Sequence, residues 1–112
     1  MKPTLFWLLA MSFSAAVQAT SFVHSTDVLE ELRLTYDRND PAEKAAYYRG
    51  YVAGVADSTY GSAWCPPARV SAEQTHAIVS KYIQGNPAMP GNRDAVEIVR
   101  TALGESFPCR MK

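Results

Sequence analysis

Two cysteines, one histidine and one aspartate are the side chains of this sequence whose types and positions suggest chemistry. Cys65 could act as a nucleophile with His76 as its base, because a thiol needs a neighbouring base to become the attacking thiolate. The second cysteine, Cys109, offers the alternative of a structural disulfide that consumes both thiols. Asp57 could be a buried acid, although an aspartate near a helix end more often bonds backbone N–H groups of the following turn.

Residues 1–19 have the pattern of a secretory signal peptide. Lys2 gives a positive start, an apolar run extends from Leu5 to Val17, and small residues end at Ala19. The apolar stretch of about 13 residues is shorter than the roughly 20 that a membrane-spanning helix needs, which disfavours a retained membrane anchor. We therefore expect cleavage after Ala19, a periplasmic location and no membrane contact after cleavage.

An exported chain with only two cysteines favours the disulfide over the nucleophile. Pairing Cys65 with Cys109 would close a loop of about 45 residues and stabilise the fold by about 4 kcal/mol. His24 and His76 are far apart in the sequence, and with both thiols consumed we expect no metal site. No nucleophile–base pair then remains, so we expect no cofactor and no enzymatic activity.

Composition limits the remaining classes of function. The chain of 112 residues carries 11 basic and 11 acidic side chains, for a formal net charge of zero. Nucleic acid is not an expected partner, because domains that bind it present clustered positive charge. Residues 20–112 suffice for a single domain with one modest core, at a size where a disulfide adds useful stability.

Four helical segments and no strand pattern predict a small all-α bundle of four to five helices, closed by the disulfide. Apolar residues recur at helical spacing on one face of each segment, with Ser80, Arg93 and Asp94 on faces expected to meet water. The expected N-terminal capping residues are Asp27, Asp40, Ser71 and Asn92.

Two glycines stand inside the second predicted helix, where each costs about 1 kcal/mol relative to alanine. Gly50 and Gly54 share one side of this helix with Ala46, Ala53 and Asp57, opposite its apolar face. The pattern predicts that another backbone approaches the glycine side closely. We therefore expect the second helix to lie in the centre of the domain, with contacts on both faces.

Two loops carry candidate partner-binding side chains, because loop residues of these types often anchor protein partners. The loop between the third and fourth helices contributes Asn86, Met89, Asn92 and Arg93. The loop after the second helix contributes Tyr60, Trp64 and Arg69. For Trp64 two assignments stay open, a contact with a partner and a place in the core beside the disulfide.

The sequence resembles the Tai/Rap-type immunity proteins in three segments: Gly50-Tyr51-Val52-Ala53-Gly54-Val55-Ala56-Asp57, Trp64-Cys65-Pro66-Pro67 and Phe107-Pro108-Cys109. These are small periplasmic proteins that neutralise peptidoglycan amidase effectors of type VI secretion systems. The resemblance covers residues 27–109. It implies an α-helical fold, a disulfide matching Cys65–Cys109, a homodimer, and inhibition by occupying the active-site cleft of the effector.

Two features differ from the pattern of that family. Many members carry a second cysteine pair, which would lie near Tyr36 and Tyr48 and is missing here. Many also have Leu-His near the start of the last helix, where this chain has Met89-Pro90-Gly91-Asn92. The first difference indicates that the retained disulfide is the essential one, and the second bears on which effector is recognised.

The sequence thus predicts a periplasmic immunity protein whose partner is a cognate amidase effector. The alternative is a periplasmic structural or stress-related helical protein without a toxin partner, which the sequence pI of about 6.7 suits equally well. Gene neighbourhood distinguishes the two, because an immunity protein is expected beside a secretion or amidase gene.

Overall fold

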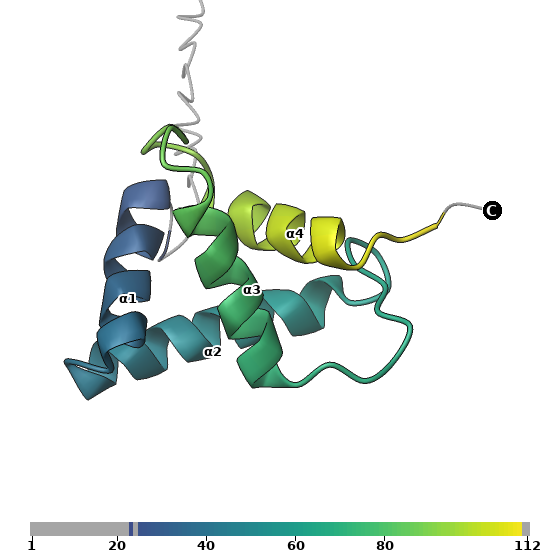
Figure 1. The fold of residues 1–112 in the computed structure, drawn as a ribbon, viewed down its shortest axis with the longest axis horizontal. Helices are drawn as coiled ribbons and strands as arrows, with labels where there is room; N and C mark the ends of the chain where they lie inside the picture. Colours follow the sequence, from purple (N-terminus) through teal and green to yellow (C-terminus); the bar gives the residue numbers. More distant parts are fainter. Residues whose placement is uncertain (1–22, 24, 111–112) are drawn as a thin grey trace, which may run out of the picture.

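A computed structural model describes residue 23 and residues 25–110, so the predicted signal peptide lies outside the described residues. The described chain forms four α-helices: α1 (Thr26–Arg38), α2 (Ala42–Thr59), α3 (Ala72–Gln84) and α4 (Ala95–Ser106) (Figure 1). The predicted all-α class is confirmed. None of the helices in this part of the chain is long and apolar enough to cross a membrane.

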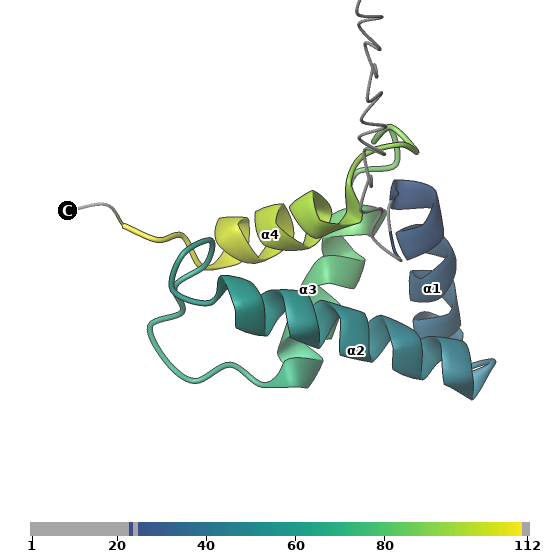
Figure 2. The same ribbon diagram turned by 180° about the vertical axis from the view of Figure 1, so that it is seen from behind.

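The helices are arranged around α2, which contacts each of the other three. Figures 1 and 2 show α1 at the N-terminal end of α2, α3 crossing over its middle, and α4 running above its C-terminal half. The core between them contains fully buried apolar side chains from all four helices: Leu29, Tyr48, Val52, Val79, Ile98, Val99 and Leu103. The helical periodicity of the sequence predicted these faces because it reports which side of each helix leaves water.

The predicted helix starts are confirmed at one position and wrong at three. Ser71 caps α3 with the full capping box, in which its hydroxyl accepts from Gln74 N and its N–H donates to Gln74 Oε1. Ser25, rather than Asp27, caps α1 by accepting from Val28 N at 3.5 Å. The N–H of Asp27 instead donates to the Gly91 carbonyl at 3.2 Å, which ties the start of α1 to a distant loop.

The other two helices also begin at residues different from the predicted ones. In α2 the capping position is Pro41, with no side-chain cap, and the Asp40 N–H donates to Thr35 O at 3.1 Å. In α4 the cap is Asp94, which accepts from Val96 N at 3.2 Å, and Asn92 lies two residues earlier in the loop. The loop before α4 is therefore longer than expected.

The prediction for the glycine side of α2 is not met within the described chain. The helix is central, but it makes its contacts through the side that carries Tyr48 and Val52. Gly50 and Gly54 are exposed, and a Cβ added to either would have no described atom within 4 Å. This side of α2 is an open surface of small residues.

The predicted disulfide is confirmed. Cys65 and Cys109 are bonded at an S–S distance of 2.01 Å, which joins the loop after α2 to the segment after α4. The backbone strengthens this junction, because Cys65 N donates to Phe107 O at 2.8 Å. This disulfide, called the staple below, therefore fixes the C-terminal end of the domain to the loop between α2 and α3.

Candidate partner-binding surfaces

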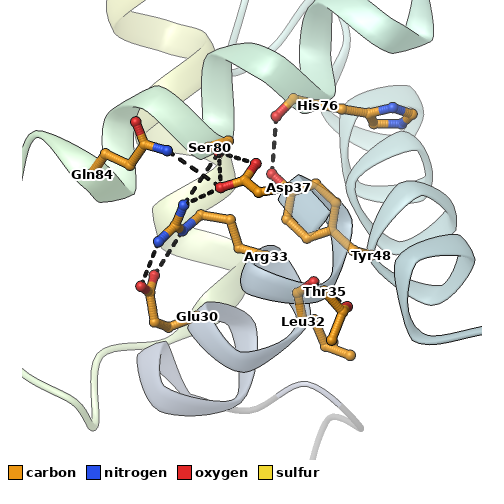
Figure 3. A network of polar contacts seen from close by, with 9 residues as sticks. All are labelled: Glu30, Leu32, Arg33, Thr35, Asp37, Tyr48, His76, Ser80 and Gln84. Atoms are coloured by element: carbon orange, nitrogen blue, oxygen red, sulfur yellow. Dashed lines mark hydrogen bonds and ion pairs between the residues drawn. The ribbon is translucent and has the colours of Figure 1, made fainter. Parts of the chain in front are cut away.

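Two of the candidate catalytic groups, Cys65 and His76, are engaged in structure, whereas Asp57 is exposed. The Cys65 thiol is consumed by the disulfide. His76 is buried between helices, with Nε2 at 3.0 Å from the Arg49 carbonyl, and its own carbonyl accepts from the Tyr48 hydroxyl at 2.9 Å (Figure 3). Burial also raises the pKa of Tyr48 above its ordinary value. Within the described residues no group of three or more His, Cys, Asp or Glu side chains could hold a metal ion.

The first candidate surface is the α3–α4 loop, residues 85–94. Asn86 Nδ2 donates to Tyr82 O at 2.7 Å and so covers a free carbonyl at the end of α3. From α1, Thr26 Oγ1 donates to the Arg93 carbonyl at 3.1 Å, and the Asp27 N–H donates to Gly91. Helices α1 and α3 therefore both brace this loop, and it does not depend on its own turns alone.

Arg93 is half-buried and does not face water as predicted, because its guanidinium reaches back across the loop. Nη1 donates to Tyr82 Oη at 3.2 Å and to Met89 Sδ at 3.1 Å, and Nη2 donates to Thr101 Oγ1 at 3.3 Å. Met89 is also half-buried and packs against the core, whereas Asn86 and Asn92 are exposed. The four predicted contact residues therefore divide into two that are half-buried, Met89 and Arg93, and two that are exposed, Asn86 and Asn92.

Two hollows lie beside the α3–α4 loop. One, of about 410 Å³, lies toward α1 and is lined by Asp27, Glu30 and Arg33 together with loop residues. The other, of about 400 Å³, is lined by residues 85–90 and Arg93. Asn86, Pro87 and Met89 line both hollows and so form the ridge that separates them.

The second candidate surface is the α2–α3 loop, residues 60–71, and the structure brings its three predicted residues together. Tyr60, Trp64 and Arg69 line one hollow of about 530 Å³, and Asp57 lines it as well. Tyr60 is 63% exposed, but Trp64 is only 4% exposed and belongs to the core. The indole Nε1 of Trp64 donates to Ala56 O at 2.9 Å, and its ring meets the Tyr60 ring edge-on at 5.4 Å. Trp64 supports the exposed tyrosine from below and is not itself a free contact.

A polar network between α1 and α3 was not predicted from the sequence. Arg33, only 5% exposed, donates to Glu30 and Asp37 on its own helix (Figure 3). Asp37 accepts in turn from Ser80 Oγ at 3.1 Å and Gln84 Nε2 at 3.3 Å on α3. Ser80 is therefore buried and not in water as expected. The spacing Glu30–Arg33–Asp37, three and then four residues, was the sequence signal for this network.

The Arg33 network also shifts the pKa of the Glu30 carboxyl group. Hydrogen bonding to the Arg33 guanidinium lowers the pKa of Glu30 below its ordinary value, against the opposing effect of partial burial. Glu30 and Asp27 face the hollow on the α1 side of the loop. That hollow therefore holds two carboxylates and the Arg33 guanidinium, whereas Arg93 is the charged side chain in the described lining of the other.

The fold and these surfaces define a small helical binding protein. Its cysteines form a staple, its candidate histidine supports the core, and its two long loops are braced and bordered by hollows. A family model for Rap1a immunity proteins matches residues 24–109, and the chain belongs to this family. No curated protein matches the sequence closely enough to count as a relative. The protein is thus an immunity protein, a non-enzymatic class that protects against a toxin effector by binding it.

Proposed function

We propose that this protein is a periplasmic immunity protein that binds a peptidoglycan amidase effector of a type VI secretion system and covers its active site. Membership of the Rap1a immunity family carries the proposal. The signal-peptide pattern of residues 1–19 supports a periplasmic location, and the disulfide suits an oxidising compartment. A peptidoglycan amidase acts in that same compartment.

The α3–α4 loop is our candidate for the element that contacts the effector. It projects past the ends of α3 and α4 beside the start of α1 (Figure 1). Its exposed side chains include Asn86 and Asn92, while Arg93 and Met89 hold it from within. A loop already fixed in shape loses less conformational entropy when it enters a cleft, which favours tight binding.

The α2–α3 loop offers a second contact through Tyr60 and Arg69. Both are exposed at one hollow, and Trp64 fixes the tyrosine ring from beneath. Tyrosine and arginine are over-represented among residues that dominate binding energy.

A homodimer, as the family resemblance implies, would use a different surface. The open side of α2 with Gly50 and Gly54 would let a second helix approach closely.

Co-expression tests the proposed function. The amidase encoded beside this gene is directed to the periplasm of a host cell, alone and together with the full chain, and lysis is followed by culture turbidity. We expect lysis from the amidase alone and protection when this protein is present. A signal-less version, which stays outside the periplasm, is the matched control and should not protect. Undiminished lysis by every neighbouring toxin would contradict the proposal.

A further inference from the structure

Arg93 stands at the base of the α3–α4 loop with neutral partners only. Its guanidinium donates to a phenol, a thioether and a hydroxyl, and no carboxylate of the described residues pairs with it. Because these acceptors are neutral, they do not cancel the net positive charge of the guanidinium, which can still attract an anion. Fixing the side chain in advance also reduces the entropy lost when that anion binds.

The Arg93 guanidinium has N–H groups that its contacts within the loop and with the helices do not use. Arginine has five N–H groups. The contacts with Tyr82 and Met89 use Nη1, and the contact with Thr101 uses one N–H of Nη2. Within the described part of the chain, Nε–H and the other Nη2–H have no partner. The free Nε–H can donate a charge-assisted hydrogen bond to a carboxylate at its edge of the guanidinium.

The surroundings of Arg93 favour an acidic group from outside. The hollow that it lines, about 400 Å³, is otherwise bounded by residues 85–90, none of which is charged. Across the ridge of Asn86, Pro87 and Met89, the neighbouring hollow carries Asp27 and Glu30 together with Arg33, which is paired with Glu30. Arg33 is thus paired with carboxylates of its own helix, whereas Arg93 is not, so an incoming acidic group is drawn to the Arg93 side of the loop, which would orient the partner.

We propose that Arg93 binds a carboxylate side chain of the effector in this hollow and so orients the effector on the α3–α4 loop. This inference rests on the proposed function, because it names the chemistry of the partner at that loop. The competing role is purely structural, in which Arg93 only braces the loop. The two roles differ in how binding responds to charge and to salt.

Binding measurements separate these roles. The affinity of the neighbouring amidase is measured by calorimetry at two salt concentrations for the wild type, Arg93→Gln and Arg93→Lys, with thermal unfolding as a check on folding. Loss of the charge should weaken binding by about tenfold or more and flatten its salt dependence, and lysine should restore part of both. Lys81→Gln removes an exposed cation from α3 as the matched control and should change affinity less than about twofold.

Two results would overturn the proposal: a folded Arg93→Gln variant that binds like the wild type, or glutamine and lysine variants equally weak with unchanged salt dependence. A second measurement uses only the wild-type protein, so it depends neither on the folding of a variant nor on the amidase. The Nε–H NMR signal of Arg93 in the wild type is titrated with sodium acetate and, separately, sodium chloride. We expect a shift with acetate alone, and no shift would also refute the site. If the wild type binds no neighbouring amidase, the proposed function fails while the acetate result still judges the site.

Discussion

The two long loops of this domain are held by different kinds of interaction. The α2–α3 loop is fixed by the Cys65–Cys109 bond and by the buried Trp64. The α3–α4 loop is fixed by hydrogen bonds, from Asn86 and Arg93 within the loop and from Thr26 on α1. In Figure 1 they lie at different ends of the domain, one near the C-terminus and the other beside the start of α1.

This difference suggests that the α2–α3 loop contributes mainly to the stability of the domain and the α3–α4 loop mainly to recognition of a partner. A covalent bond and a buried indole stabilise the first loop whether or not a partner is present. The polar groups that brace the second loop keep unused donors, as Arg93 shows. A loop built in this way can extend its own hydrogen-bond network into a partner. The comparison predicts that the largest stability effects occur at the disulfide end.

Breaking the staple should have the largest effect. Cys109→Ser removes a cross-link between residues 44 apart in the sequence, which should cost about 4 kcal/mol in the free energy of unfolding. Urea unfolding measured with and without a reductant checks this. The wild type in reductant should match the variant, and reductant should leave the variant unchanged. A variant that unfolds together with the oxidised wild type would show that the staple does not stabilise this end.

Two glycine substitutions give an effect of intermediate size with opposite signs. A Cβ at Gly104 on α4 would lie 2.9 Å from the Ala63 carbonyl of the α2–α3 loop, so Gly104→Ala should destabilise the fold by about 1–3 kcal/mol. A Cβ at Gly54 on α2 meets no described atom, so Gly54→Ala should stabilise by about 1 kcal/mol. Urea unfolding of both variants measures the difference.

The same pair of variants tests the contact between α4 and the α2–α3 loop. Equal stabilisation by both would contradict the close approach of Gly104 to Ala63. If a second copy of the chain packs on the open side of α2, Gly54→Ala should also weaken the dimer, which sedimentation measures. The outcome at Gly54 thus distinguishes an exposed helix surface from a dimer interface.

The sequence predicted the helices and their buried faces well, because the apolar residues of a buried helix face recur at helical spacing within a single segment. Helix starts were harder, because several capping residues lie close together. Ser25 and Asp27 both suit the start of α1, and the N–H of Asp27 is taken by Gly91, far along the chain. Asn92 and Asp94 present the same ambiguity for α4. Only the tertiary contacts decide between such neighbours.

The candidate surfaces show the same limit for side chains. Sequence reasoning identified the loop residues but not which of them are engaged internally. Trp64 bonds to Ala56, and Arg93 reaches Thr101 in the next helix. The Arg33 network depends on Ser80, which is distant in sequence and looked like a surface residue. A local pattern cannot report a partner that folding brings from elsewhere.

The smallest predicted effect concerns pH and lies at the hydrogen-bonded end. Arg33 holds the pKa of Glu30 below its ordinary value, so the folded state binds a proton at Glu30 less readily than the unfolded chain. The stabilisation is therefore present above the unfolded pKa, near 4.3, and is lost as pH falls through the folded value. Because Glu30 is partly exposed, Glu30→Gln should cost less than about 1 kcal/mol at neutral pH.

Urea unfolding at a series of pH values tests this prediction. The stability gap between wild type and Glu30→Gln should be widest near neutrality and shrink as the pH falls below the unfolded pKa of glutamate, because protonated glutamate and glutamine are both uncharged. Glu97→Gln, in the exposed pair with Arg100, is the matched control and should show a smaller gap. The disulfide does not titrate, so the gap between wild type and Cys109→Ser should persist where the Glu30 gap has closed. A Glu30 gap that stayed constant down to pH 3 would mean that this charge does not stabilise the α1 side of the loop.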